Sequence, residues 1–191
     1  EEVMARIRAE RDRFVGFVLE DIEKTDDKYN IRKKATFIDN QNLRVGDSII
    51  EAKSIVIATG SSPIIPSMFD GLGDLLVVND DIFEWKNLPE SVAVFGPGVI
   101  GLELGQALHR LVVRIRVFGS SGSLRPLSDL KIKNYAENIF RKEFAIDTKS
   151  KLFGIKREYD KAKIRFLDRA NGLEKEETLS LKTNTKSSKS T

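Results

Sequence analysis

A glycine pattern between two apolar runs limits the folds that this chain can adopt. Gly96, Gly98 and Gly101 follow a short apolar run with the spacing G-x-G-x-x-G, and an amphipathic segment at 100–111 comes directly after them. A second apolar run, at 112–118, follows that segment. The order of strand, glycine turn, helix and strand is the context in which this spacing indicates a dinucleotide-binding unit.

Each glycine of the pattern has its own physical reason. Gly96 permits the tight turn out of the strand, and Gly98 has no Cβ that would keep a pyrophosphate away from the backbone. Gly101 lets the helix pack close to the strand. The unpaired N–H groups and the dipole of the helix N-terminus then favour phosphate. The predicted cofactor-binding residues of this loop are Gly96, Pro97, Gly98, Val99, Ile100 and Gly101.

The composition is typical of a soluble globular protein. Of the 191 residues, 40% are hydrophobic and 32% are charged, and the formal net charge is +3. No apolar run is long enough to span a bilayer and no secretory leader is recognisable, so we expect no membrane partner and a cytoplasmic location. Nucleic-acid binding would require a basic stripe with interleaved aromatic residues, which the sequence lacks, so we expect no nucleic-acid partner.

The chain has no cysteine, and this limits its chemistry. Without a thiol it has no structural disulfide, no dithiol redox centre and no thiolate metal site. The single histidine, His109, lies in the segment predicted as a helix and has no second histidine with which to share a metal. We therefore predict no metal site and no catalytic side chain in this chain.

Hydrophobic periodicity divides the first part of the chain into a helix and several strands. Apolar residues recur at three- and four-residue steps over residues 1–24, which predicts an amphipathic helix whose apolar stripe packs against other residues. Residues 54–58 are apolar on both faces, which predicts a buried strand of a parallel sheet. Three short strands with turns between them are predicted at 35–38, 42–45 and 48–50.

The remainder of the chain is predicted to hold a linker, a second domain and a tail. Residues 63–90 contain several prolines and glycines, which predicts a linking region rather than a core. A helix is predicted over 127–144, and Asn171-Gly172 is a hairpin signal. Further strands are predicted at 151–156, 162–167 and 177–181. The expected parts are residues 1–86, residues 87–181 and a disordered polar tail at 182–191.

Two motifs in this order resemble a known family. An apolar run ends in Ala58-Thr59-Gly60, and the glycine pattern follows at 96–101. The pair resembles the pyridine nucleotide–disulfide oxidoreductases and, within them, the bacterial dihydrolipoamide dehydrogenase-like enzymes. The resemblance covers residues 1 to about 181. It implies an α/β fold of the Rossmann-like FAD/NAD(P)-binding type, with a parallel sheet, three-stranded meander insertions and flanking helices.

The resemblance implies two dinucleotide cofactors, FAD and either NAD or NADP. The Ala-Thr-Gly element resembles the second FAD-binding motif, where the chain passes under the flavin pyrophosphate, and Ala35 falls in the meander that lies against the FAD adenine. Glu103 resembles the glutamate that holds the nicotinamide end beside the flavin. Val99 matches a position where lipoamide dehydrogenases carry an aliphatic residue. The implied FAD-binding residues are Ala35, Thr59, Gly60 and Ser61.

Several parts of the family pattern have no counterpart in this sequence. The first FAD motif, the redox-active cysteine pair, the C-terminal His-Glu base and the dimerisation domain are absent from it. The chain thus resembles the middle of an enzyme that passes a hydride between NAD(P)H and FAD, and the implied parent is a homodimer. We expect the isolated chain to bind nucleotide at best and not to turn over. Val112 stands where a glycine commonly follows Arg-Leu, and it is strained if that turn needs a positive φ.

The sequence leaves the preference between NAD and NADP open. An NAD site expects an acidic residue about 20 positions after the first glycine, where it binds ribose hydroxyls. The matching position here is Gly119. Ser120, Ser121 and Arg125 could hydrogen-bond a 2′-phosphate, although an NADP site usually has a closer arginine. Gly119 and Ser120 are therefore included among the predicted cofactor-binding residues.

Two other interpretations also fit the sequence. A non-catalytic nucleotide-binding or sensing module would use the Rossmann unit alone and would bind nucleotide without flavin. A degenerate remnant that lacks the redox disulfide would fold poorly, and Val112, the missing acid and the polar tail favour it.

Overall fold

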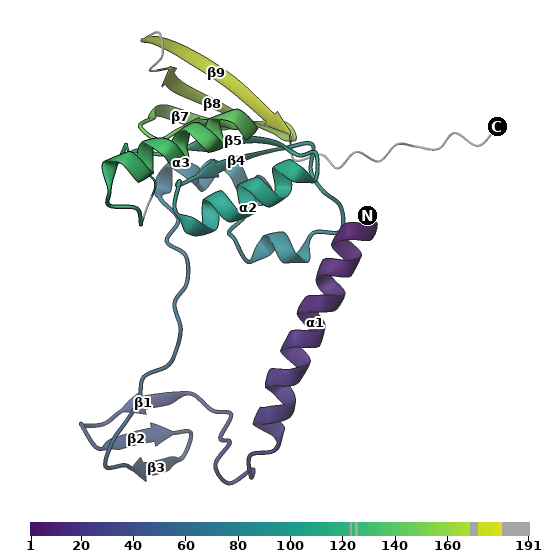
Figure 1. Ribbon diagram of the computed structural model, residues 1–191. Helices are drawn as coiled ribbons and strands as arrows, with labels where there is room; N and C mark the ends of the chain where they lie inside the picture. Colours follow the sequence, from purple (N-terminus) through teal and green to yellow (C-terminus); the bar gives the residue numbers. More distant parts are fainter. Residues whose placement is uncertain (123, 125, 169–171, 181–191) are drawn as a thin grey trace, which may run out of the picture. The chain divides into compact units, whose positions relative to one another are not determined.

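The chain divides into two compact units. The computed structural model describes residues 1–122, 124, 126–168 and 172–180. Arg8–Pro63 forms the smaller unit, and Glu1–Ile7 together with Ile64–Thr191 forms the larger one. The larger unit contains the glycine pattern, so its fold determines the geometry of the predicted dinucleotide site (Figure 1).

A parallel sheet with the strand order β4-β5-β6 is the centre of the larger unit. β4 (Ser91–Phe95) pairs with β5 (Arg114–Phe118), which pairs with β6 (Ala145–Asp147). α2 (Val99–Arg110) connects β4 to β5, and α3 (Leu130–Glu143) connects β5 to β6. Parallel neighbours cannot be joined by a tight hairpin, and these two helices supply the crossovers that they need.

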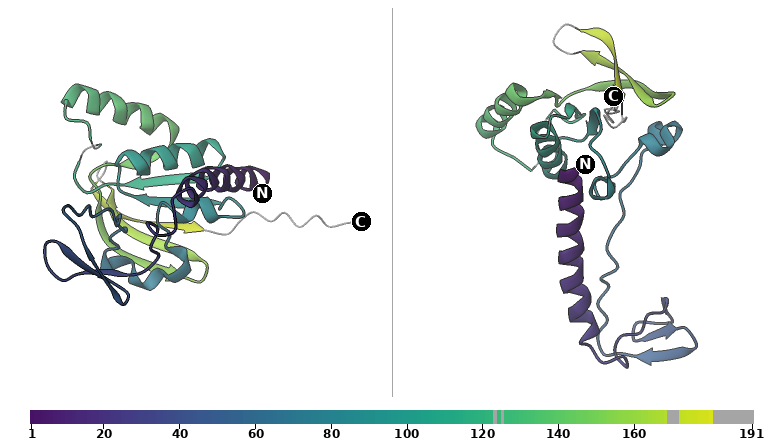
Figure 2. Two further views of the ribbon diagram at one scale, coloured as in Figure 1. Left: turned by 90° about the horizontal axis from the view of Figure 1, so that it is seen from below. Right: turned by 90° about the vertical axis from the view of Figure 1, so that its right-hand side faces the viewer.

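The larger unit has three layers. α2 and α3 cover one face of the parallel sheet, and an antiparallel sheet covers the other (Figure 2, left view). The strands of that second sheet are β7 (Lys151–Glu158), β8 (Lys161–Asp168) and β9 (Leu173–Ser180). The buried core on the helix side contains Val92, Leu102, Leu108, Val113, Ile115, Val117, Leu124, Phe144 and Ile146. The buried core on the other side contains Phe118, Ile164, Phe166 and Leu179. The predicted α/β fold class is thereby confirmed.

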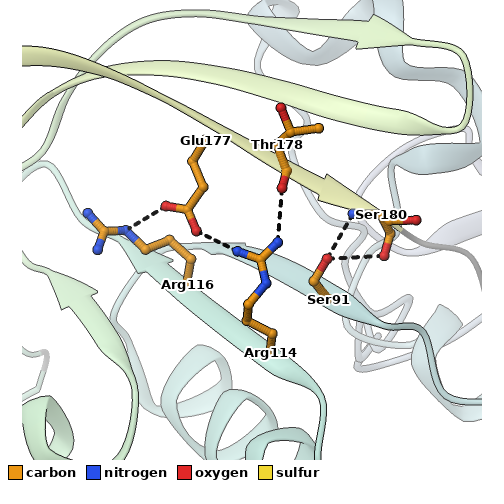
Figure 3. Close-up of polar contacts among 6 residues, drawn as sticks. All are labelled: Ser91, Arg114, Arg116, Glu177, Thr178 and Ser180. Carbon is orange, nitrogen blue, oxygen red and sulfur yellow. Dashed lines mark hydrogen bonds and ion pairs between the residues drawn. The ribbon is translucent and has the colours of Figure 1, made fainter.

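Polar contacts hold strand β9 to the parallel sheet (Figure 3). The buried Ser91 hydroxyl accepts a hydrogen bond from the Ser180 amide at 2.8 Å and donates one to the Ser180 carbonyl oxygen at 3.2 Å. The Arg114 guanidinium donates to Glu177 Oε1 and to the Thr178 carbonyl oxygen, both at 2.9 Å. The two sheets are therefore joined through β4 and β5 by specific hydrogen bonds as well as by apolar packing.

A three-stranded antiparallel sheet is the main feature of the smaller unit, as predicted. Its strands are β1 (Ala35–Phe37), β2 (Asn42–Val45) and β3 (Ser48–Glu51). The Asp39 carboxylate closes the first turn by accepting hydrogen bonds from the Gln41 and Asn42 amides, each at 2.8 Å. The backbone hydrogen bond from Gln41, followed by that from the Asn42 side chain, lowers the pKa of Asp39 because both favour the charged form.

Two predictions for the first part of the chain are wrong. α1 (Glu2–Glu23) forms, but among its residues, all of them described, Met4 alone is buried, and Phe14 is 61% exposed. Residues 54–58, which the structure describes in full, form no strand, and Val56 is 87% exposed. A buried strand needs neighbours that pair with its backbone, and each three-stranded sheet that the described residues form is complete without residues 54–58.

Three details of the larger unit also differ from the prediction. Residues 63–90 contain two 3₁₀ segments, η1 (Ser67–Leu75), which is kinked at Gly73, and η2 (Asp81–Glu84). Phe69 of η1 is buried against Phe95 with ring centroids 4.8 Å apart. α3 begins at residue 130 rather than 127, because the Asp129 side chain caps it. Strand β6 was not predicted. The predicted turn residue Asn171 and the predicted tail, residues 182–191, lie outside the described residues.

Candidate functional site

The turn between β4 and α2 has the open geometry that a phosphate-binding loop requires. Gly96 has a φ of +118°, which side-chain-bearing residues rarely adopt, and its amide donates to the Phe118 carbonyl oxygen at 2.8 Å. Gly98 is the N-cap of α2, and a Cβ placed on it would meet no atom within 4 Å. The space in front of the Gly98 backbone is therefore free for a ligand.

Gly101 is required for the contact between α2 and β4. A Cβ on this residue would overlap the Gly96 carbonyl oxygen and would lie 3.2 Å from Val94 Cγ1. Only glycine lets the first turn of the helix lie this close to the strand and its loop. This is the packing role that the sequence predicts for the third glycine of the pattern.

The N-terminus of α2 differs from that of α3 in how its backbone donors are satisfied. At α3, the Asp129 carboxylate accepts hydrogen bonds from the Lys131 and Ile132 amides at 2.8 and 3.0 Å. At α2, the N-cap Gly98 supplies no side-chain acceptor. Because the first N–H groups of a helix have no partner within the helix, α2 offers its positive end to an external anion.

The end of β5 lies against the glycine loop. Gly119 is buried, and a Cβ on it would lie 2.6 Å from Pro97 Cγ and 2.9 Å from the Thr148 carbonyl oxygen. Ser120, the next residue, is exposed. The structure therefore brings the predicted residues of 96–101 together with Gly119 and Ser120 at the carboxyl edge of the parallel sheet, where ligands of such sheets bind.

A third loop, after β6, borders the same place and was missed from the sequence. The Ser150 amide donates to the Gly119 carbonyl oxygen at 2.5 Å, and the Gly122 amide donates to the Thr148 carbonyl oxygen at 2.7 Å. These bonds join residues 148–150 to the loop that follows β5. The only signal in the sequence is the short apolar pair Ala145-Ile146 after a helix, which is too brief to identify a strand.

The remaining predicted residues of this region lie on α2. Val99 and Ile100 are 48% and 57% exposed in its first turn. Glu103 is exposed one turn further along the helix. The two apolar side chains therefore reach solvent beside the loop.

The predicted FAD-binding residues belong to the smaller unit. Ala35 begins β1 opposite Val45 and is exposed. Thr59, Gly60 and Ser61 are exposed in a segment outside any helix or strand, and Gly60 has a φ of +70°. Nothing in this unit tests their relation to a flavin, and their role stays a prediction.

The described residues offer neither a metal-binding cluster nor a membrane-spanning helix. Within them, no group of three or more His, Asp or Glu side chains lies close enough to hold a metal ion. No helix in the described part of the chain is long and apolar enough to cross a bilayer.

Comparison with curated proteins finds similarity to oxidoreductases that are much longer than this chain. Mercuric reductase from Staphylococcus aureus is 35% identical over 103 residues, which cover 53% of this chain and 19% of that protein. Dihydrolipoyl dehydrogenase 2, chloroplastic, from Arabidopsis thaliana is 29% identical over 116 residues, covering 61% and 20%. The soluble pyridine nucleotide transhydrogenase of a Marinomonas strain is 32% identical over 100 residues, covering 52% and 22%. The chain thus spans about a fifth of the length of these relatives.

Structural comparison and a family profile agree with these similarities. A Cu(II) complex of the HOCl-induced flavoprotein disulfide reductase RclA from Escherichia coli has a similar fold, with a TM-score of 0.61. It shares 21% sequence identity, and the match covers 69% of this chain and 31% of that protein. The profile of the pyridine nucleotide-disulphide oxidoreductases matches residues 8–178. The chain therefore belongs to the pyridine nucleotide-disulphide oxidoreductase family.

Proposed function

We propose that residues 87–181 form the NAD(P)H-binding part of a FAD-dependent oxidoreductase in which a hydride passes between NAD(P)H and FAD. Members of the family use FAD and NAD(P)H. The observation that carries the proposal is the uncapped N-terminus of α2 behind Gly98, where a Cβ would meet no atom within 4 Å. A pyrophosphate placed there accepts hydrogen bonds from the first amides of the helix and interacts favourably with its dipole.

The residues around this loop have different roles in binding NAD(P)H. Gly98 lets the phosphates approach the backbone, and Gly101 keeps α2 against β4 so that its amides point at them. Val99 and Ile100 offer apolar contact beside the loop, and Glu103 orients the nicotinamide end. When bound, NAD(P)H supplies the hydride, and the protein contributes binding and orientation.

The smaller unit is proposed to contribute to the flavin site of the same parent enzyme. Ala35 would lie against the adenine, and the segment containing Thr59, Gly60 and Ser61 would pass under the pyrophosphate. The positive φ of Gly60 suits a backbone that must come close to a ligand. Because this chain has no cysteine, it has no redox disulfide of its own, and we propose that it binds nucleotide without turning over.

Titration of the full chain with NADH and with NADPH tests the proposal. Trp85 is partly buried against the core on the helix side of the sheet, and its fluorescence reports binding through energy transfer to the reduced nicotinamide. We expect saturable binding. Gly98→Val should raise Kd at least about tenfold, because the added side chain keeps the phosphates from forming charge-assisted hydrogen bonds with the first amides of α2.

Gly154→Val is the matched control for this variant. A Cβ on Gly154 also meets no atom within 4 Å, and this residue belongs to β7, outside the proposed nucleotide-binding residues. It should bind nucleotide like the unaltered chain. A folded chain that binds neither nucleotide, or a Gly98→Val variant with unchanged affinity, would refute the proposed site.

A further inference from the structure

We propose that this site prefers the 2′-phosphorylated dinucleotide, NADP(H), over NAD(H), with Lys149 as the residue that recognises the added phosphate. The inference rests on the proposed function, because it concerns the adenosine end of the same nucleotide. It follows from three observations: a position closed to any acid, a lysine attached to the neighbouring loop, and two exposed hydroxyl groups beside it.

Gly119 occupies the position from which an acidic residue would bind the ribose hydroxyls of NAD. A Cβ there would lie 2.6 and 2.8 Å from Cγ and Cδ of Pro97, and 2.9 Å from the Thr148 carbonyl oxygen. These separations are shorter than real Cβ contacts. The pyrrolidine ring is rigid, and the Thr148 carbonyl is held by the Gly122 amide at 2.7 Å. An acidic residue therefore cannot occupy this position unless two loops move.

Lys149 is held beside the loop that follows β5. A Cβ on Gly122 would lie 3.3 Å from Lys149 Cδ and 3.5 Å from its Cγ, so the aliphatic stem of the lysine runs along this loop. The Lys149 amide donates to Asp147 Oδ1 at 2.9 Å. This bond engages the Asp147 carboxylate with the backbone of the same turn. Lys149 itself is exposed, so the side chain is accessible to a ligand in solution.

Ser120 and Ser121 complete a set of groups suited to a phosphate. Both are exposed in the loop whose ends are fixed by the Gly119 and Gly122 hydrogen bonds. Hydroxyl groups donate to phosphate oxygens, and a lysine acts on phosphate as a point charge. A ribose hydroxyl gains little from a cation, whereas a 2′-phosphate gains a charge-assisted hydrogen bond. The combination therefore discriminates between the two dinucleotides.

The test compares Kd values of NADPH and NADH for the full chain and two lysine variants. The unaltered chain should bind NADPH roughly tenfold more tightly than NADH, because hydrogen bonds to charged groups contribute that much. Lys149→Met should remove most of this ratio by weakening NADPH binding alone. Lys151→Met is the matched control, since the Lys151 ammonium lies over the Phe153 ring, 5.4 Å from its centroid. It should leave the ratio unchanged.

The possible outcomes separate this inference from the proposed function. Equal or tighter binding of NADH by the unaltered chain would overturn the inference and leave the proposed function intact. A Lys149→Met variant that weakens both nucleotides equally would also overturn it. A folded chain that binds neither nucleotide would overturn both. A Gly119→Asp variant gives a second check: it should lower the melting temperature rather than convert the chain to NADH binding.

Discussion

The two units of this chain differ in how their apolar residues are buried. In the larger unit, Val117 and Ile164 are fully buried on opposite sides of the parallel sheet. In residues 8–63, all of which are described, Val45 is the only buried hydrophobic residue, while Val56 and Ile57 are 87% and 71% exposed. Regular local structure is thus present in both units, but only the larger one encloses a core. Hydrogen-bonded turns can form a meander without a core, whereas a nucleotide-binding edge needs strands fixed by packing on both faces.

The largest expected effect is a difference in unfolding free energy between two isoleucine variants, one in each unit. Ile164→Ala in β8 should lower the free energy of unfolding by about 3 to 4 kcal/mol, because it leaves a cavity in a fully buried site. Ile49→Ala in β3 should change it by less than about 0.5 kcal/mol, because that side chain is 63% exposed. Denaturant unfolding followed by circular dichroism measures both. Similar losses from the two variants would show that the smaller unit has a core after all.

The next effect concerns two glycines of the same helix. Gly101→Ala should destabilise the larger unit by about 2 to 3 kcal/mol, because the new methyl group collides with the Gly96 carbonyl oxygen. Gly105→Ala should be neutral or stabilising, because its Cβ would sit at an ordinary 3.6 Å from Ile115 Cγ2. Unfolding midpoints of the two variants provide the comparison. If both behave alike, the close contact of α2 with β4 does not depend on the third glycine.

A smaller, opposite effect is expected at the end of α2. Val112 has a φ of +69° there, with its amide bonded to the His109 carbonyl oxygen and the Val113 amide bonded to that of Leu108. This is the Schellman ending, in which glycine normally takes the position of Val112. Val112→Gly should stabilise the larger unit by about 1 kcal/mol by relieving the strain of a branched residue at positive φ. Val112→Ala, which keeps a Cβ, should gain less, and a loss of stability in the glycine variant would contradict this reasoning.

The smallest effect is local to the meander. The pKa of Asp39 is lowered by the Gln41 backbone hydrogen bond, so the carboxylate stabilises its turn above the ordinary pKa of 3.8 and loses this contribution as the pH falls through the lowered value. In an NMR pH titration, the chemical shift of the Gln41 amide should change over the same pH range as that of the Asp39 carboxyl group. Asp39→Asn should abolish that change. A Gln41 amide that moves independently of Asp39 would show that the turn is not closed by the carboxylate.

The same contrast explains which features were predictable from the sequence. The helix α2, the flanking strands and the possible strain at Val112 follow from local patterns in the larger unit, as do the short strands of the meander. Strand β6 was missed because its three residues carry too little pattern. The apolar segment 54–58 was misread because apolar composition reports a tendency to be buried, and burial depends on neighbouring strands that local sequence does not specify. Lys149 was missed as a candidate for the same reason, since only the pairing of β5 with β6 brings it to Gly122.

The most direct test of the account is the response of the backbone amides to nucleotide. In a heteronuclear NMR titration of the full chain with NADPH, the amides of Val99, Ile100 and Gly101 should shift most, together with those at 119–122. Residues 35–61 should stay unchanged, because we propose that the larger unit alone binds the nicotinamide dinucleotide. Unchanged amides at 99–101 in a folded chain at saturating NADPH, or shifts confined to residues 8–63, would contradict the claim that the uncapped start of α2 is the phosphate-binding site.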